Sequence, residues 1–172
     1  MTIPSLEDYI LGETGSDLAF TNAEDGAAIA LAMVSQARKD LAILSRDLDP
    51  QRYDTQAFVG AVSTLARRSR YSRVQILIQE PAAVTKTGHR LLWLAQRLTS
   101  SIEMRKVAED YQGIEEAYLV ADKTGFIYRP QSVLSRGTAN FNDRARARAL
   151  AARFQEIWDK SVPDRELQRL YL

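Results

Sequence analysis

Short apolar runs recur in the chain and predict buried strands. Residues 41–44 and 74–78 are mostly aliphatic, which is typical of strands covered on both faces of a sheet. Pro50 and Pro81 follow these runs and cannot continue a hydrogen-bonded ladder. Residues 102–107 alternate in character, which predicts a third strand.

Segments with apolar residues at helical spacing lie between and around these strands. We predict four helices, over about residues 21–38, 55–69, 85–99 and 143–160. Thr21 and Glu24 have the spacing of a capping box at the first helix. Asp54 is suited to cap the second helix, and Asn142 or Asp143 the last one.

The order of these elements predicts an α/β fold. Residues 117–122 and 126–129 flank Gly125 and predict a β-hairpin. Strands that alternate with helices favour a parallel sheet with helices on both faces. We therefore predict a mixed, mostly parallel sheet that ends in an antiparallel hairpin. Functional side chains are expected at the carboxyl ends of the parallel strands.

A chain of 172 residues fits one domain. We place this domain at residues 21–162. Residues 1–20 mix glycine and serine with isolated apolar residues, which predicts an irregular tail or linker. Residues 163–172 are expected to form a C-terminal tail that docks as one more turn. The residues expected to dock are Leu167, Leu170 and Tyr171.

The composition excludes several classes of site. The chain has no cysteine, which rules out disulfide scaffolds, thiolate zinc sites, iron–sulfur clusters and cysteine nucleophiles. His89 is the single histidine, so a two-histidine metal site cannot form. We expect no cofactor and no resident metal.

Charge gives a weaker indication of the partner. Lys and Arg number 23 and Asp and Glu 22, a balance that does not by itself indicate nucleic-acid binding. Arginine outnumbers lysine, which fits either anion recognition or the nucleotide composition of the genome. No apolar run approaches the ~18 residues that span a bilayer. The acidic start lacks the basic region of a signal peptide, so we predict a cytoplasmic protein.

Two short segments carry candidate polar groups. Arg46, Asp47 and Asp49 follow the first predicted strand, where they either face a ligand or form a turn. His89 lies near the start of the third predicted helix. It is either an acid–base group or a hydrogen-bonded histidine without a catalytic role.

The last predicted helix is rich in arginine. Arg144 and Arg148 lie one turn apart on one face, and Arg146 and Arg153 lie two turns apart on another. These residues either form a phosphate-binding stripe or a solvated face paired with nearby carboxylates.

Residues 117–125 and 137–141 resemble the core of the phospholipase D-like superfamily. That family carries His-x-Lys-x-x-x-x-Asp on a strand and its exit, and then a Gly-Ser-x-Asn segment. Asp122 takes the position of the motif aspartate, and Asn140 that of the asparagine. The resemblance implies a single phospholipase D-like repeat.

The sequence departs from this motif at the reacting groups. Counting back from Asp122, Glu115 takes the histidine position and Ala117 the lysine position. In the family, the histidine attacks phosphorus and the lysine binds the phosphoryl oxygens. Neither Glu115 nor Ala117 can replace these functions. The resemblance therefore implies a degenerate relative, of bacterial type, without catalytic residues.

We consider three functions. The first is a non-catalytic binding or interaction module for a phosphate-bearing ligand or nucleic acid. Its candidate ligand-binding residues are Arg46, Asp47, Asp49, His89, Asp122, Asn140, Arg144 and Arg148. The second is a metal-dependent phosphodiesterase or other hydrolase that uses carboxylates, for which Mg²⁺ is a suitable ion. These carboxylates are Asp47, Asp49, Glu115 and Asp122. The third is an accessory domain of a larger protein.

The resemblance also implies a homodimer. Phospholipase D-like sites are built where two repeats meet, and this chain has the length of one repeat. A two-fold interface would cover the exposed surface. The apolar residues expected at this interface are Tyr118, Phe126, Tyr128 and Phe141.

Overall fold

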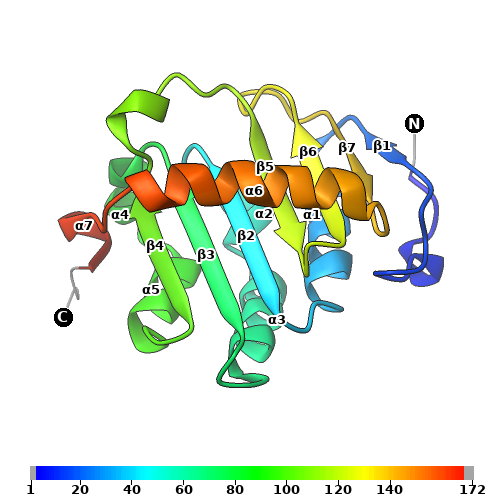
Figure 1. Cartoon of the computed structure of the whole chain (residues 1–172), viewed down its shortest axis with the longest axis horizontal. Helices are drawn as coiled ribbons and strands as arrows, with labels where there is room; N and C mark the ends of the chain where they lie inside the picture. The colour runs from blue at the N-terminus through cyan, green and yellow to red at the C-terminus, as the bar shows by residue number, and fades with distance from the viewer. Residues whose placement is uncertain (1–2, 169–172) are drawn as a thin grey trace.

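A seven-stranded sheet forms the centre of the protein (Figure 1). The computed structural model describes residues 3–168. The strands are β1 (Leu18–Phe20), β2 (Asp40–Ser45), β3 (Arg73–Ile78), β4 (Ile102–Lys106), β5 (Ala117–Ala121), β6 (Gly125–Arg129) and β7 (Gly137–Asn140). They lie in the order β1-β7-β6-β5-β2-β3-β4. The predicted α/β class with a mixed sheet is confirmed.

The sheet has a parallel half and an antiparallel half. β2, β3 and β4 run parallel, and β5 lies antiparallel to β2. β6, β7 and β1 extend the antiparallel half, which makes the parallel part smaller than expected. Because β5 runs opposite to β2, β5 begins where β2 ends. We call the edge at which β2, β3 and β4 end the carboxyl edge, and the opposite one the amino edge.

Helices cover both faces of the sheet. They are α1 (Ala23–Val34), α2 (Pro50–Tyr53), α3 (Gln56–Arg67), α4 (Pro81–Thr87), α5 (Arg90–Arg97), α6 (Arg144–Lys160) and α7 (Arg165–Gln168), with 3₁₀ turns at Leu6–Asp8 and Glu109–Tyr111. α6 crosses one face, and α1, α3 and α5 pack against the other (Figure 1). No helix in the described part of the chain has the length and apolar character needed to cross a membrane.

Local signals explain most helix boundaries. Asp143 caps α6 by accepting the Arg146 N–H, as predicted, but Thr55 caps α3 in place of Asp54. The helix predicted over residues 85–99 is divided into α4 and α5. Gly88 lies between them with φ of 72°, a conformation that favours glycine.

The residues expected at a dimer interface lie largely in the core instead. Tyr118 and Phe126 are each 2% exposed and pack in the apolar layer under α6. Phe141 is fully buried in the layer on the opposite face. Tyr128 is half-buried and donates its hydroxyl hydrogen to Glu116. The interface prediction is therefore wrong for Tyr118, Phe126 and Phe141, because helices and the N-terminal segment cover both faces of the hairpin.

The segment before α1 packs on the sheet. β1 pairs with β7, and its three residues are too few to show a strand pattern in the sequence. Upstream, Gly12 donates its N–H to the Phe141 carbonyl, and the Gln36 side chain bonds the backbone of Tyr9 and Leu11. At the other end of the chain, Leu167 is buried. The predicted docking residues Leu170 and Tyr171 lie outside the described residues.

Candidate functional site

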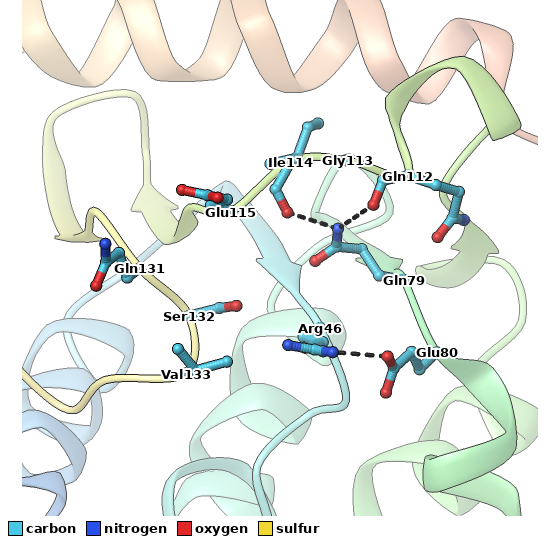
Figure 2. A pocket seen from close by; sticks show the side chains of 10 residues that line it. All are labelled: Arg46, Gln79, Glu80, Gln112, Gly113, Ile114, Glu115, Gln131, Ser132 and Val133. Atoms are coloured by element: carbon cyan, nitrogen blue, oxygen red, sulfur yellow. Dashed lines mark hydrogen bonds and ion pairs between the residues drawn. The ribbon is translucent and has the colours of Figure 1, made fainter.

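The carboxyl edge contains a cavity of about 370 Å³ (Figure 2). It lies where β2 and β3 end and where β5 begins, as the topology of parallel strands predicts. Its lining residues are Arg46, Gln79, Glu80, Gln112, Gly113, Ile114, Glu115, Gln131, Ser132 and Val133. Of the candidate ligand-binding residues, Arg46 lines this cavity, together with Glu115 at the histidine position of the family motif.

Hydrogen bonds hold the walls of this cavity in place. The Gln79 amide nitrogen donates to the carbonyl oxygens of Gln112 (3.2 Å) and Ile114 (2.8 Å). These two acceptors determine which end of the Gln79 amide faces them. Its carbonyl oxygen is buried and has no hydrogen-bond partner among residues 3–168. Arg46 Nε lies 3.1 Å from Glu80 Oε1, so these two side chains form an ion pair.

A second, more open hollow of about 550 Å³ adjoins the cavity toward α6. The two hollows share Gly113, Ile114 and Glu115. Glu116 lines the second hollow, where it accepts a hydrogen bond from Arg153 Nε at 2.7 Å and another from the Tyr128 hydroxyl. Burial and the Glu116 carboxylate together raise the pKa of Tyr128 to about 12.

Two buried arginines lie behind Ala117, the residue at the lysine position. Arg52 and Arg129 are 3% and 7% exposed and line a small void together with Ala117. The segment between β6 and β7 covers them: Arg52 donates to the Ser135 carbonyl, and Arg129 to two carbonyls of the same segment. Burial lowers the pKa of Arg52, and the nearby Arg129 lowers it further.

Asp122 lies at the amino edge, far along β5 from Glu115. Its carboxylate accepts the backbone N–H groups of Arg38 (2.8 Å), Lys39 (2.8 Å) and Asp40 (3.0 Å). Its own N–H donates to the Asp40 carbonyl. Asp122 and Arg46, both candidate ligand-binding residues, therefore lie at opposite edges of the sheet, because antiparallel pairing places the end of β5 at the start of β2.

Other candidate residues stabilise local structure. Asn140 donates to the Gly15 carbonyl and to Asp17, which fastens the N-terminal segment to β7. Asp49 caps α2 and forms an ion pair with Arg52. Asp47 is exposed on the loop after β2. These contacts explain Asn140 and Asp49 without a ligand.

His89 is a buried helix cap. It is 1% exposed, its Nδ1 accepts the Leu91 N–H, and its Nε2 lies 3.0 Å from the Leu48 carbonyl. An acceptor at Nδ1 leaves the proton on Nε2, so this arrangement requires the neutral imidazole. Burial lowers the pKa of His89 below its ordinary value. The residue is therefore not accessible to a ligand.

We expect the stability of the fold to fall as pH decreases below about 6.5, in part because of His89. The unfolded chain takes up a proton on this residue in that range, whereas the folded chain resists it, so acid favours unfolding. In His89→Asn, the asparagine side chain can still cap α5 but does not titrate. Urea unfolding of both proteins between about pH 5 and 8 should show a smaller pH dependence in the variant. If the free energy of unfolding depended on pH equally in both proteins, the buried, neutral state of His89 would be contradicted.

The carboxylates of the alternative metal site do not converge. Asp122 lies at the amino edge and Glu115 at the carboxyl edge, while Asp49 is held by the α2 backbone and Arg52. No cluster of three acidic or histidine side chains suited to a metal ion occurs within residues 3–168. The alternative of a metal site built from Asp47, Asp49, Glu115 or Asp122 therefore finds no convergent group of carboxylates within the described residues.

Exposed cations gather at the amino edge. They are Arg38, Lys39, Arg67, Arg68, Arg70, Arg73, Arg97 and Lys123, and we call this group the basic edge. It combines the loop before β2, the α3–β3 loop, the end of α5 and the β5–β6 turn. Asp40 and Asp122 are the carboxylates within these segments, and three backbone amides already surround Asp122.

The basic edge continues onto α6. A hollow of about 310 Å³ lies between them, lined in part by Arg73, Lys123 and Gln155. Arg144 and Arg148 are exposed and precede Gln155 on the same helical face. By contrast, Arg146 and Arg153 on other faces are paired with carboxylates.

Sequence reasoning missed Gln79, Arg52, Arg129 and most of the basic edge. Gln79 directly follows an apolar strand, which is a signal that could have placed it at the carboxyl edge. No sequence pattern signals that Arg52 and Arg129, which lie in distant segments, share one void.

The fold is similar to solved structures of low sequence identity. TrmBL2, an archaeal chromatin protein, aligns with 92% of this chain at a TM-score of 0.66 and 11% identity, and this chain spans 57% of that chain. Nuc of Salmonella typhimurium, a phospholipase D family member, aligns with 87% of this chain at a TM-score of 0.61 and 13% identity. NucT of Helicobacter pylori aligns with 87% at 0.62 and 13% identity. This chain covers 99% of the Nuc and NucT chains.

These similarities establish the phospholipase D-like fold. No curated protein matches the sequence. Residues 22–170 match the family described as Domain of unknown function (DUF7931). This match covers most of the chain, which therefore belongs to that family and has a phospholipase D-like fold.

Proposed function

We propose that this protein is a non-catalytic phospholipase D-like module that binds nucleic acid through the basic edge. The observation that carries the proposal is the separation of charge. Eight exposed cations and two carboxylates occupy the segments of the amino edge, whereas the cavity of the carboxyl edge is lined by Glu80, Glu115 and one cation, Arg46, which is paired with Glu80. Arg73 lies opposite Asp40 in the parallel pairing of β2 and β3, and its backbone N–H donates to the Lys39 carbonyl. These contacts hold the cations before β2 close to those at the start of β3. A dense array of cations favours a polyanion through counterion release.

The surface next to the basic edge suits a nucleic-acid backbone. The hollow beside Arg73 and Lys123 continues toward Arg148 and Arg144 on α6, which extends the positive surface. Tyr71 is 69% exposed, and the Arg70 guanidinium lies 4.9 Å from its ring centre. An exposed aromatic ring among arginines can stack on an unpaired base. Phosphate contacts should nevertheless dominate, because cations far outnumber exposed rings there.

The carboxyl edge is unsuited to phosphodiester cleavage. Glu115 cannot form the covalent intermediate that the family's histidine forms, and its negative charge repels a phosphate. Ala117 is buried and offers no charge to phosphoryl oxygens. The nearby cation Arg46 is paired with Glu80. These features support binding without turnover.

A protein with a similar solved structure gives separate support for this proposal. TrmBL2, which shares the fold, is described as a chromatin protein with a novel mode of DNA binding. Because this chain spans 57% of that chain, the likeness does not extend to the whole protein. The proposal for this chain therefore rests on its own basic edge.

The test measures the affinity for labelled single- and double-stranded oligonucleotides by fluorescence anisotropy across a salt series. The logarithm of the affinity for duplex should fall with the logarithm of salt concentration, with a slope of roughly −0.9 per phosphate neutralised. Replacing Arg70 and Arg73 with Gln should weaken binding about tenfold or more and reduce the slope by about one unit for each arginine that neutralises a phosphate. The oligonucleotides should be recovered intact with or without EDTA.

A matched double variant at the other edge controls for total charge. Lys86 and Lys106 are exposed and lie on α4 and at the end of β4, so replacing both with Gln removes the same charge away from the basic edge. Its affinity should match that of the unmodified protein. An equal loss in both double variants, or no binding at low salt, would refute the proposal.

The homodimer and the cytoplasmic location remain predictions. With Tyr118, Phe126 and Phe141 buried, a dimer would need other contact residues. Val133 and Leu134 are exposed apolar residues of the β6–β7 segment, and Val133 lines the cavity of the carboxyl edge. Sedimentation equilibrium measures the mass of the protein in solution and therefore tests whether it is a dimer.

A further inference from the structure

We propose that the carboxyl-edge cavity binds a small organic cation that carries ammonium groups, such as an aliphatic diamine. This site lies at the opposite edge of the sheet from the basic edge, so it goes beyond the proposed nucleic-acid function. Three observations carry the proposal. Within the described residues, they are a buried acceptor without a donor, a carboxylate without an ion-pair partner, and a second acidic hollow beside the first.

The buried acceptor is the carbonyl oxygen of Gln79. This residue is 7% exposed, and its amide nitrogen is already bound to two backbone carbonyls. The oxygen therefore cannot be exchanged with the nitrogen, and it lacks a donor within the described chain. In Figure 2 it points toward the side of the cavity on which Ser132 and Glu115 lie. A buried acceptor of this kind is satisfied by a ligand that donates hydrogen bonds.

The free carboxylate is Glu115. Its side chain is exposed and makes no ion pair with any residue in the range 3–168, whereas its backbone carbonyl accepts the Ser132 N–H. The other charged groups of the cavity, Arg46 and Glu80, neutralise each other. The cavity therefore has a net negative charge. An ammonium group suits a cavity that has a free carboxylate and an unpartnered acceptor in its wall, because it is positive and donates up to three hydrogen bonds.

The second hollow explains why more than one ammonium group fits. Glu115 lines both hollows, and Asp110 lines the second one. Glu116 and Arg153 pair there, which leaves Asp110 and Glu115 as the lining carboxylates without a close ion pair among the described residues. A flexible diamine can place one ammonium group near Glu115 and the other near Asp110. Phosphates and dicarboxylates would meet repulsion at both places.

The test is isothermal titration calorimetry of the full-length protein with putrescine, at low salt and without nucleic acid. Butanediol and succinate serve as probes of similar chain length that lack the positive charge or reverse it. We expect heat of binding with putrescine and none with the other two. Glu115→Gln keeps the size of the side chain and removes its charge. It should weaken putrescine binding by about tenfold.

Two further variants test whether putrescine binds in the cavity: a charge control outside it and a replacement of the buried acceptor. Glu24→Gln removes an exposed charge from α1 and should leave putrescine affinity unchanged. Gln79→Met removes the buried acceptor and should weaken binding even where melting curves show a folded protein. Tighter binding of succinate than of putrescine, or putrescine affinity that is equal in Glu115→Gln and Glu24→Gln, would overturn the proposal. Since these titrations contain no nucleic acid, their failure leaves the basic-edge proposal standing.

Discussion

Replacing Asp122 with alanine is expected to lower the free energy of unfolding by about 3 kcal/mol. The backbone N–H groups of Arg38 and Lys39 in the α1–β2 loop and of Asp40 at the start of β2 would lose their shared charged acceptor. Hydrogen bonds to charged groups contribute about 1.5–3 kcal/mol each, and partial exposure to water reduces their sum here. Asp122 also has φ of 53°, a conformation that aspartate tolerates better than alanine does.

Urea unfolding followed by circular dichroism measures this effect. A loss of that size corresponds to a melting temperature lower by about 6–12 °C for a chain of this length. Asp122→Asn keeps one oxygen acceptor and should lose less than Asp122→Ala. Asp47→Ala is the matched control, because Asp47 is exposed and its replacement should change stability by less than about 0.5 kcal/mol. If both alanine variants were equally stable, the anchoring role of Asp122 would be refuted.

Gly137→Ala should destabilise the fold by about 3 kcal/mol or more. A methyl group at this position would lie 2.3 Å from the Tyr128 carbonyl oxygen and 2.7 Å from the Phe20 ring. The carbonyl belongs to the neighbouring strand β6, so relief requires the backbone of the sheet to move. Overpacking that shifts backbone atoms is among the most damaging kinds of substitution.

Gly60→Ala provides the matched control within the same chain. Gly60 is exposed in α3, and a methyl group there meets no described atom within 4 Å. Alanine has a higher helix propensity, so this variant should gain about 0.5–1 kcal/mol. Thermal melting of both variants should therefore show changes of opposite sign. A Gly137→Ala protein as stable as the parent would show that the β6–β7 pairing is looser than described.

Asp122 and Gly137 have structural roles that need no substrate. Both lie in the segments that resemble the phospholipase D-like pattern, and both have contacts that explain them. Asn140 likewise fastens the N-terminal segment. The motif positions that lack such an explanation are Glu115, which faces a cavity, and Ala117, which lies over the buried arginines.

The elements whose signals are local could be predicted from the sequence. The aliphatic runs of β2 and β3, the β5–β6 hairpin and the stripe of α6 could be recognised because each depends on neighbouring residues. The mixed α/β class followed from their order. β1 and β7 could not be predicted, because strands of three or four residues are too short to show an alternating pattern of apolar and polar residues. Their pairing also depends on partner strands that are distant in the sequence.

Which polar residues lie close together depends on the fold and could not be predicted from local patterns. The chain direction of β5 separated Asp122 from Arg46 and placed Glu115 beside the β2 and β3 ends. The burial of His89 depended on Leu48, a residue 41 positions away. The basic edge joins four segments that each carry only a few cations, because charges that are far apart in sequence add their fields only when folding brings them together.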